Sequence, residues 1–248
     1  ARQMFTDSYA PAEWSFSTYM RPFVGASGDW GDTNHHCVEE ALWANFVATN
    51  AWTTSWSAGV TASGTSVAFD FDNSNSVTLG VFDLYFVLGG ASSGSKTVYK
   101  IEGCVANSAS IDFDIDGIAT INWSGFGKII KDESDLAVGE NEEGAPTPTI
   151  AEAITSTSNF IRNRLTSLTA SSALSGSNIS YDLVLTGGNI TFENNITFLT
   201  PETLGVVNQP LGHVTGTRAI SGNFTCYLNT DTNSSADLFE DIIEATTT

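Results

Sequence analysis

The chain has 248 residues, enough for one large or two smaller β domains with a buried core. Lys and Arg total 9 against 28 Asp and Glu, so the formal net charge is −19, which argues against a protein that binds nucleic acid or anionic membranes tightly. No apolar run reaches the roughly 18 residues that a membrane-spanning helix needs.

The first part of the chain alternates strand-like runs with Gly, Ser and Asn clusters, which is typical of β-rich domains. One exception is 37–49, where Val38, Leu42 and Phe46 recur at helical spacing and predict a helix with one apolar stripe. The run at 77–90 is rich in β-branched and aromatic residues and is apolar at odd and even positions alike. This pattern predicts a strand that is covered on both faces.

Asp112, Asp114 and Asp116 alternate with large apolar residues within 110–123. Alternating carboxylates also open a calcium-binding loop, but such a loop needs a bidentate Glu at its twelfth position, which here is Trp123. The alternation instead predicts a β-strand with one buried and one exposed face. The three carboxylates would then stand together on the exposed face.

Gly117 follows the last of these carboxylates and allows the chain to bend or turn. A two-residue hairpin turn would set Asp112 opposite Ile121 and mix the two faces. A long strand bent at Gly117 keeps the faces intact, and so does a three-residue hairpin loop. Because that loop would force β-branched Ile118 toward positive φ, we expect the bent strand.

The segment 132–150 is acidic, contains Gly and Pro and has no periodicity, so we predict a linker there. Strand-like runs resume after it. A second helix is predicted at 234–245, with one apolar stripe and with Ser234 and Asp237 as a capping pair.

Two segments, SFSTYM at 15–20 and NFTCYL at 223–228, match in character at every position, and a polar loop and a predicted helix follow each. A repeated strand-loop-helix unit predicts two copies of one small domain. We therefore expect a mainly β fold of two tandem β-sandwich or barrel domains, each with one flanking α-helix, at 1–131 and 151–248, on either side of the linker. The first domain is expected to lack its leading strands, and the second to be incomplete at its C-terminal side.

Motifs for catalysis are weak. The Gly-rich run at 89–97 has one residue too many for a phosphate-binding loop and lies between predicted strands. Asp112, Asp114 and Asp116 line one strand face, whereas the two carboxylates of a glycosidase face each other across a cleft. We expect a protein that is not an enzyme and that uses neither a metal nor a cofactor.

Four segments, taken in chain order, carry a family resemblance: APAEWSFSTYM near the start, then 98–127, 159–170 and 181–229. Together they resemble the tail tube proteins of T-five-like siphophages. The resemblance implies two tube-type domains in one polypeptide, three subunits per ring, and rings that stack into a hollow tail tube through which genome DNA passes without specific binding. It also implies a virion component that is assembled in the host cytoplasm and that meets copies of itself, the tape measure protein and tail-end proteins.

In such a tube a negative lumen wall would keep DNA centred and let it slide, because contacts that release counterions would hold it. We hypothesise that the face of Asp112, Asp114 and Asp116 contributes to this wall. The alternative for these residues is a solvated outer strand. A second hypothesis for the whole protein is a monomeric β-sandwich adhesin that binds glycans. It rests on the Trp-rich loops GDWGD and AWTTSW, which contain Trp30, Trp52 and Trp56, and on the Asn-x-Ser/Thr sequons.

Overall fold

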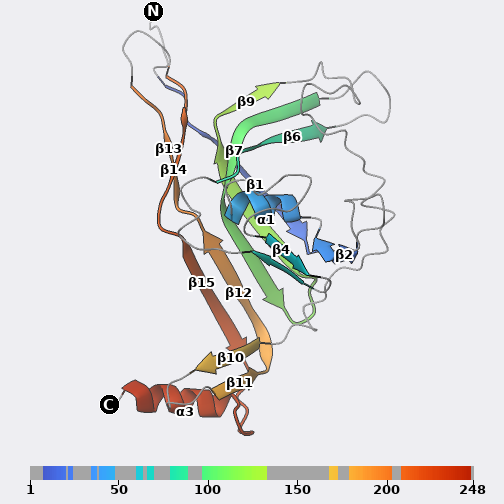
Figure 1. The fold of residues 1–248 in the computed structure, drawn as a ribbon, viewed down its shortest axis with the longest axis vertical. Helices are drawn as coiled ribbons and strands as arrows, with labels where there is room; N and C mark the ends of the chain where they lie inside the picture. Colours follow the sequence, from blue (N-terminus) through green and yellow to red (C-terminus); the bar gives the residue numbers. More distant parts are fainter. Residues whose placement is uncertain are drawn as a thin grey trace, which may run out of the picture.

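The architecture is a large antiparallel sheet with a helix packed on one face (Figure 1). Five strands follow one another across this main sheet in the order β1, β8, β7, β12, β15, and each pairs antiparallel with its neighbour. Their bounds, in that order, are Ala12–Tyr19, Thr120–Gly127, Thr97–Asp114, Leu185–Glu193 and Ala219–Cys226. The mainly β fold predicted from the sequence is confirmed. The computed structural model describes residues 8–20, 22–24, 35–37, 39–47, 60–63, 66–69, 79–88, 97–132, 168–172, 179–202 and 208–246.

Shorter elements surround the main sheet. β6 (Phe82–Leu88) and β9 (Ile129–Asp132) pair with the first half of β7. The helices are α1 (Glu40–Val47) and α3 (Ser235–Thr246), so both predicted helices are present. The two-stranded pairs are β2 (Pro22–Val24) with β3 (His35–Cys37), β4 (Val60–Ser63) with β5 (Ser66–Phe69), β10 (Leu168–Ser172) with β11 (Ile179–Leu183), and β13 (Ile196–Leu199) with β14 (Gly212–Thr215).

The core lies between α1 and the sheet face beneath it. Trp43 of α1 contacts Trp123 of β8 with 4.8 Å between ring centroids, and fully buried Phe46 lies 6.2 Å from the same ring. Trp14 of β1 is also buried. Gly125 makes room for its indole, because a Cβ at that glycine would lie 2.4 Å from an indole carbon. Aromatic packing therefore fixes α1 on the first strands of the sheet.

β7 is 18 residues long and takes part in two sets of pairings. Its second half lies between β8 and β12, whereas its first half lies between β6 and β9. The two halves meet at Gly103, whose φ of +62° favours glycine. The Gly103 N–H donates to the Asp83 carboxylate at 2.9 Å. The first half of β7 consequently curves away from the main sheet, at the top of Figure 1.

The strand predicted within 77–90 is β6, but it is not covered on both faces. Phe86 is 36% exposed, and Val81 just before the strand is 57% exposed. β6 pairs with β7 along one edge. Its apolar composition therefore exceeds what the described part of the chain buries.

β7 and β8 form a hairpin, so the predicted strand bent at Gly117 is wrong. Asp112 pairs with Thr120, which is the register of a three-residue loop. The Gly117 N–H donates to the Asp114 carbonyl at 3.1 Å and closes the turn. Ile118 does not have positive φ, so the strain expected for this loop does not arise.

The main sheet joins the two predicted halves of the chain. β7 belongs to the first predicted domain, 1–131, and β12 belongs to the second, 151–248. The two strands pair from Ser108 with Glu193 to Asp114 with Gly187. Among the described residues, β1 and β15 pair on one side only, so the sheet is open rather than a closed barrel. The division into two tandem domains stays a prediction. The linker predicted at 132–150 lies outside the described residues except for Asp132.

β1 and β15 carry the two segments that match in sequence. They run in the same direction, since four antiparallel steps separate them. Phe16 pairs with Trp123, and its counterpart Phe224 pairs with Gly188. The register across β7 and β8 puts both phenylalanines on the face that α1 covers. Phe16 packs on the core, whereas Phe224 is 41% exposed.

α3 lies at the lower end of the molecule beside β10 and β11 (Figure 1). Tyr181 of β11 donates its hydroxyl hydrogen to the Asp241 carboxylate. The predicted capping residues both act at the start of α3, but not on each other. The Asp237 carboxylate accepts from the Asn233 N–H at 2.7 Å, and the Ser234 hydroxyl donates to the Asn229 carbonyl at 2.5 Å.

A buried polar junction ties the C-terminal end of α1 to the second half of the chain. Arg218, just before β15, donates to the carbonyls of Phe46 and Val47 at 3.3 and 2.9 Å. It also donates to the Asn194 side-chain oxygen at 2.9 Å, and the Asn194 amide donates to the carbonyls of Phe46 and Ala106 at 3.0 Å. The carbonyls that a helix leaves open at its C-terminus are thus satisfied.

Candidate functional site

The face of the main sheet opposite α1 is polar across all five strands, and we call it the polar face. Strand alternation and the pairing register assign each residue to a face. Tyr19, Val105, Phe126, Gly187 and Ala219 are its exceptions. Its other residues are Glu13, Ser15, Ser17, Thr120, Asn122, Ser124, Ser108, Ser110, Asp112, Asp114, Asn189, Thr191, Glu193, Ser221, Asn223 and Thr225.

Hydrogen bonds link neighbouring strands on the polar face. Ser17 of β1 donates to the Asn122 side-chain oxygen at 2.6 Å, and the Asn122 amide donates to the Asp112 carboxylate at 2.6 Å. Thr191 of β12 donates to the Ser110 hydroxyl at 3.1 Å. These contacts join side chains of neighbouring strands across the polar face.

Two of the three predicted acidic residues belong to this face. Asp112 and Asp114 are exposed and point to the polar side of β7, whereas Asp116 lies in the turn beyond the strand end. Sequence reasoning missed Glu13 and Glu193, which the register brings to the same face. The alternation of their own strands signalled the orientation, but only the pairing of β1 and β12 into this sheet makes them part of one surface.

The polar face carries negative charge without positive charge. Its ionisable residues are Glu13, Asp112, Asp114 and Glu193, and none of its positions is Lys or Arg. The described basic residues lie elsewhere: Lys100, Lys128 and Lys131 are on or beside β7 and β9, and Arg218 is buried. The charged side chains that the strands present on this face are therefore all acidic.

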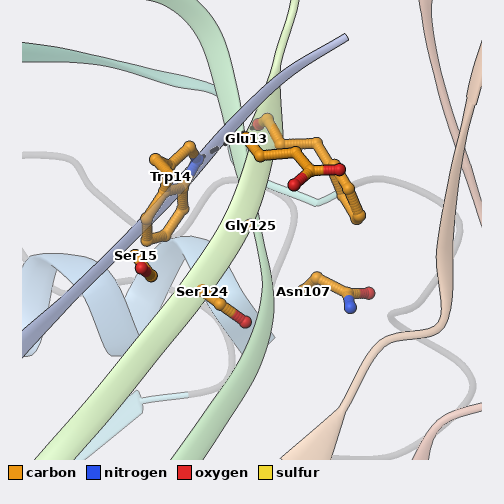
Figure 2. A pocket seen from close by; sticks show the side chains of 7 residues that line it. Glu13, Trp14, Ser15, Asn107, Ser124 and Gly125 are labelled. Atoms are coloured by element: carbon orange, nitrogen blue, oxygen red, sulfur yellow. Dashed lines mark hydrogen bonds between the residues drawn. The ribbon is translucent and has the colours of Figure 1, made fainter.

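A shallow hollow of about 470 Å³ lies at the upper part of this face (Figure 2). Glu13, Asn107, Ser124 and Phe126 line it, and Trp14 and Gly125 contribute from β1 and β8. The Asn107 side-chain oxygen already accepts the Ile196 N–H at 2.8 Å. The hollow holds one carboxylate and no paired acid and base, so its chemistry is that of a polar surface.

Shifted pKa values have structural causes. Burial raises the pKa of Cys104 to about 12, and the hydrogen bond to Asp241 raises the pKa of Tyr181 to about 12. Burial alone would lower the pKa of Lys100, but hydrogen bonds to Asp83 and Tyr85 raise it. The hydrogen bond from Lys131 lowers the pKa of Glu102. Each of these groups sits in a fixed pair or in the core, which accounts for its shift without catalysis.

The sequence matches the family model described as phage tail tube protein over residues 39–248. The chain belongs to this family. It is also 30% identical over 240 residues to the tail tube protein pb6 of Escherichia phage T5, an alignment that covers 97% of the chain and 48% of the relative. The chain spans about half the length of that curated relative.

Membership of the tail tube family makes this chain a structural virion protein and confirms the resemblance found in the sequence. Of the described tryptophans, Trp14 and Trp123 are buried, and Trp43 is partly buried against the core. Trp30, Trp52 and Trp56, which belong to the loops of the adhesin hypothesis, lie outside the described residues. In the part of the chain that the structure describes, no helix is both long and apolar enough to cross a bilayer.

Proposed function

We propose that the polar face lines the lumen of a phage tail tube. In this proposal three copies of the protein form a ring, rings stack into the hollow tube of a long non-contractile tail, and genome DNA passes through it into the host. The observation that carries the proposal is the continuity of the polar face, which crosses five strands from both halves of the chain without a basic side chain.

The side chains of the polar face suit a surface along which DNA passes rather than one that binds DNA. Proteins bind DNA through Lys and Arg contacts to phosphates, and each contact releases counterions and strengthens the complex. A wall that offers Glu13, Asp112, Asp114 and Glu193 among Ser, Thr and Asn side chains has no such contact to make. Repulsion from the wall keeps the duplex near the axis, where it slides.

The opposite face and the edges of the sheet support assembly into a ring. Ile220 and Phe224 of β15 are 60% and 41% exposed on the face that α1 covers farther along the sheet. Exposed apolar residues beside a free strand edge are a hazard in a monomer and are expected where a neighbour covers them. Lateral contact between subunits at β15 and β1 would give the backbone groups of both edge strands hydrogen-bond partners. The tape measure and tail-end proteins are the further partners proposed, with assembly in the host cytoplasm.

Electron microscopy of the purified full-length protein at high concentration tests this proposal. We expect three-fold rings and hollow tubes, with Asp112 and Glu193 facing the lumen in a reconstruction. A map that places the polar face on the outside of the tube would overturn the assignment of the lumen wall. Dispersed monomers at every protein and salt concentration would overturn ring formation itself.

The lumen assignment also has a functional test in phage. Asp112→Lys combined with Glu193→Lys should leave tube assembly intact and slow DNA release from triggered particles, with the delay largest at low salt. A matched control is Asp112→Asn with Glu193→Gln, which removes the same carboxylates without adding cations. Unchanged release kinetics in the lysine variant would contradict a lumenal position for these side chains.

A further inference from the structure

The main sheet has two unlike ends along its strand direction. At one end lie the β13–β14 hairpin and Lys128, which we call the hairpin end. At the other lies the β7–β8 turn, residues 114–118, which we call the turn end. Figure 1 shows β13 and β14 projecting upward from the main sheet, away from the end where β7 runs out into the turn.

The hairpin end exposes apolar side chains on one side only. Ile196 and Phe198 of β13 face inward and pack with Val105 and Phe126. The register puts Leu199 and Val214 on the outer side, where they are 51% and 49% exposed. Leu211, directly before β14, is 65% exposed. Packing of the inner side holds the hairpin in place, so the outer side is a fixed apolar surface.

Lys128 adds a positive charge to the hairpin end. It directly follows β8, and its stem runs over Gly103, where a Cβ would lie 3.0 Å from the lysine Cδ. Among the described residues Lys128 has no ion-pair partner. His213 of β14 lies near enough that, after burial, the Lys128 charge is the second cause that lowers its pKa. The Lys128 N–H donates to the Glu102 carbonyl at 2.8 Å, and the lysine side chain itself is exposed.

The turn end is apolar and negative. Ile115 and Ile118 are 42% and 41% exposed within the turn, and the exposed Asp114 and Asp116 stand beside them. At the neighbouring end of β15, Tyr227 and Leu228 are 62% and 79% exposed. A hairpin turn with two exposed isoleucines is unusual, because turns in water favour small polar residues.

We propose that the turn end of one copy docks on the hairpin end of a second copy. β7 and β8 are neighbours in the sheet, so a shift along the strands carries the turn of one copy toward Lys128 of the next. Ile115 and Ile118 then meet Leu199 and Val214, and the carboxylate of Asp114 pairs with the Lys128 ammonium. The inference rests on the proposed function in that the docking copies are subunits of successive rings.

The two docking surfaces differ, so the contact is heterologous. Because the proposed contact relates the copies by a shift along the strands, it repeats without limit and produces a filament rather than a closed ring or a dimer. It therefore accounts for stacking, separately from the lateral contacts that form a ring. It also gives the stack a direction, because one end of every ring carries hairpins and the other carries turns.

Charge reversal in the full-length protein tests the pairing. Lys128→Glu and Asp114→Lys should each leave rings intact and abolish tubes in electron micrographs, and the double variant should restore tubes. Glu240→Lys is the matched control for Asp114→Lys: it makes the same charge change at an exposed position on α3, which lies at the same end of the molecule as the turn but supplies no residue to the proposed contact. This variant should stack as the wild type does. Single variants that still form tubes of normal length would overturn the inference.

Mixing variants tests the polarity of the stack. A hairpin-end variant, Leu199→Ser with Val214→Ser, and a turn-end variant, Ile115→Ser with Ile118→Ser, should each give single rings. Their mixture should give pairs of rings and nothing longer, since only one intact interface can form. Long tubes from either variant alone would overturn the inference while the rings still support the proposed function. Wild-type protein without rings would instead overturn the proposed function.

Discussion

Arg218 donates a hydrogen bond of 2.9 Å to the carbonyl of Val47, a residue 171 positions earlier in the chain. Val47 ends α1, and Arg218 stands just before β15, so this bond fastens the helix of the first half to the second half. A guanidinium is well suited to this place because a helix C-terminus carries partial negative charge and open carbonyls. Asn194 completes the junction by donating to the Phe46 carbonyl.

Replacing Arg218 should therefore destabilise the whole fold. Arg218→Met keeps most of the side-chain volume but removes the hydrogen bonds from Arg218 to the Val47 carbonyl and the Asn194 side-chain oxygen. We expect a cost of about 2–3 kcal/mol in the free energy of unfolding. Urea denaturation followed by tryptophan fluorescence measures it, since Trp43 and Trp123 lie on α1 and beneath it. Lys131→Met, at a partly exposed ion pair with Glu102, is the control and should cost under about 1 kcal/mol. Equal losses of unfolding free energy in the two variants would contradict a stabilising role for the junction of Arg218 and Asn194.

Gly125 should tolerate no side chain. A Cβ there would lie 2.1 Å from the Val105 carbonyl oxygen and 2.4 Å from the Trp14 indole, so Gly125→Ala should cost about 1–3 kcal/mol through overpacking. Gly212→Ala is the control, because no heavy atom lies within 4 Å of a Cβ at that position. Thermal unfolding of the two variants measures the difference. A melting temperature for Gly125→Ala that matches the control would show that the sheet and Trp14 can move apart.

Glu102 should add to stability above acid pH. Its hydrogen bond from Lys131 lowers its pKa in the folded protein below the ordinary value of 4.5. The contribution is therefore complete above pH 4.5 and is lost as the pH falls through the folded value. The side chain is 30% exposed, so the effect should be about 0.5 kcal/mol. Glu102→Gln should flatten the acid side of a plot of unfolding free energy against pH, and a plot parallel to the wild type would contradict it.

Cys104 and Cys226 should differ sharply in reactivity. Cys104 is fully buried, its thiol donates to the Ile101 carbonyl at 3.3 Å, and burial raises its pKa to about 12, so almost no thiolate forms at pH 8. Cys226 is exposed on β15. Maleimide should label Cys226 within minutes in the free subunit and Cys104 only after unfolding, as peptide mass spectrometry would resolve. Fast labelling of Cys104 in the folded protein would mean that the strands of the core open readily.

Local patterns in the sequence predicted local structure well. The stripe of Leu42 and Phe46 identified α1, and the alternation around Asp112 identified both its strand and its exposed face. The similar segments SFSTYM and NFTCYL were each predicted to form a strand, and they lie largely in β1 and β15. These predictions succeeded because the period of the side chains is set by the backbone of one element.

Relationships between distant segments could not be predicted in this way. Nothing in the pattern of β7 or β12 states that the two strands pair, and without that pairing Glu13 and Glu193 are isolated carboxylates. The sequence analysis did not single out Arg218 and Asn194, since burial of a polar side chain depends on partners that the sequence does not place. The turn after Asp114 was missed because a clash was expected at Ile118, yet the backbone passes through it at ordinary φ.

The equal direction of β1 and β15 limits how subunits can close a ring. If β15 of one subunit paired directly with β1 of the next, all oriented alike along the tube, that seam would be parallel, with evenly spaced, slanted hydrogen bonds. Every other pairing in the main sheet is antiparallel. An antiparallel seam requires an odd number of further strands between them. Whether the number of strands between β15 and the next β1 is odd or even therefore decides which hydrogen-bond pattern each seam of the tube has.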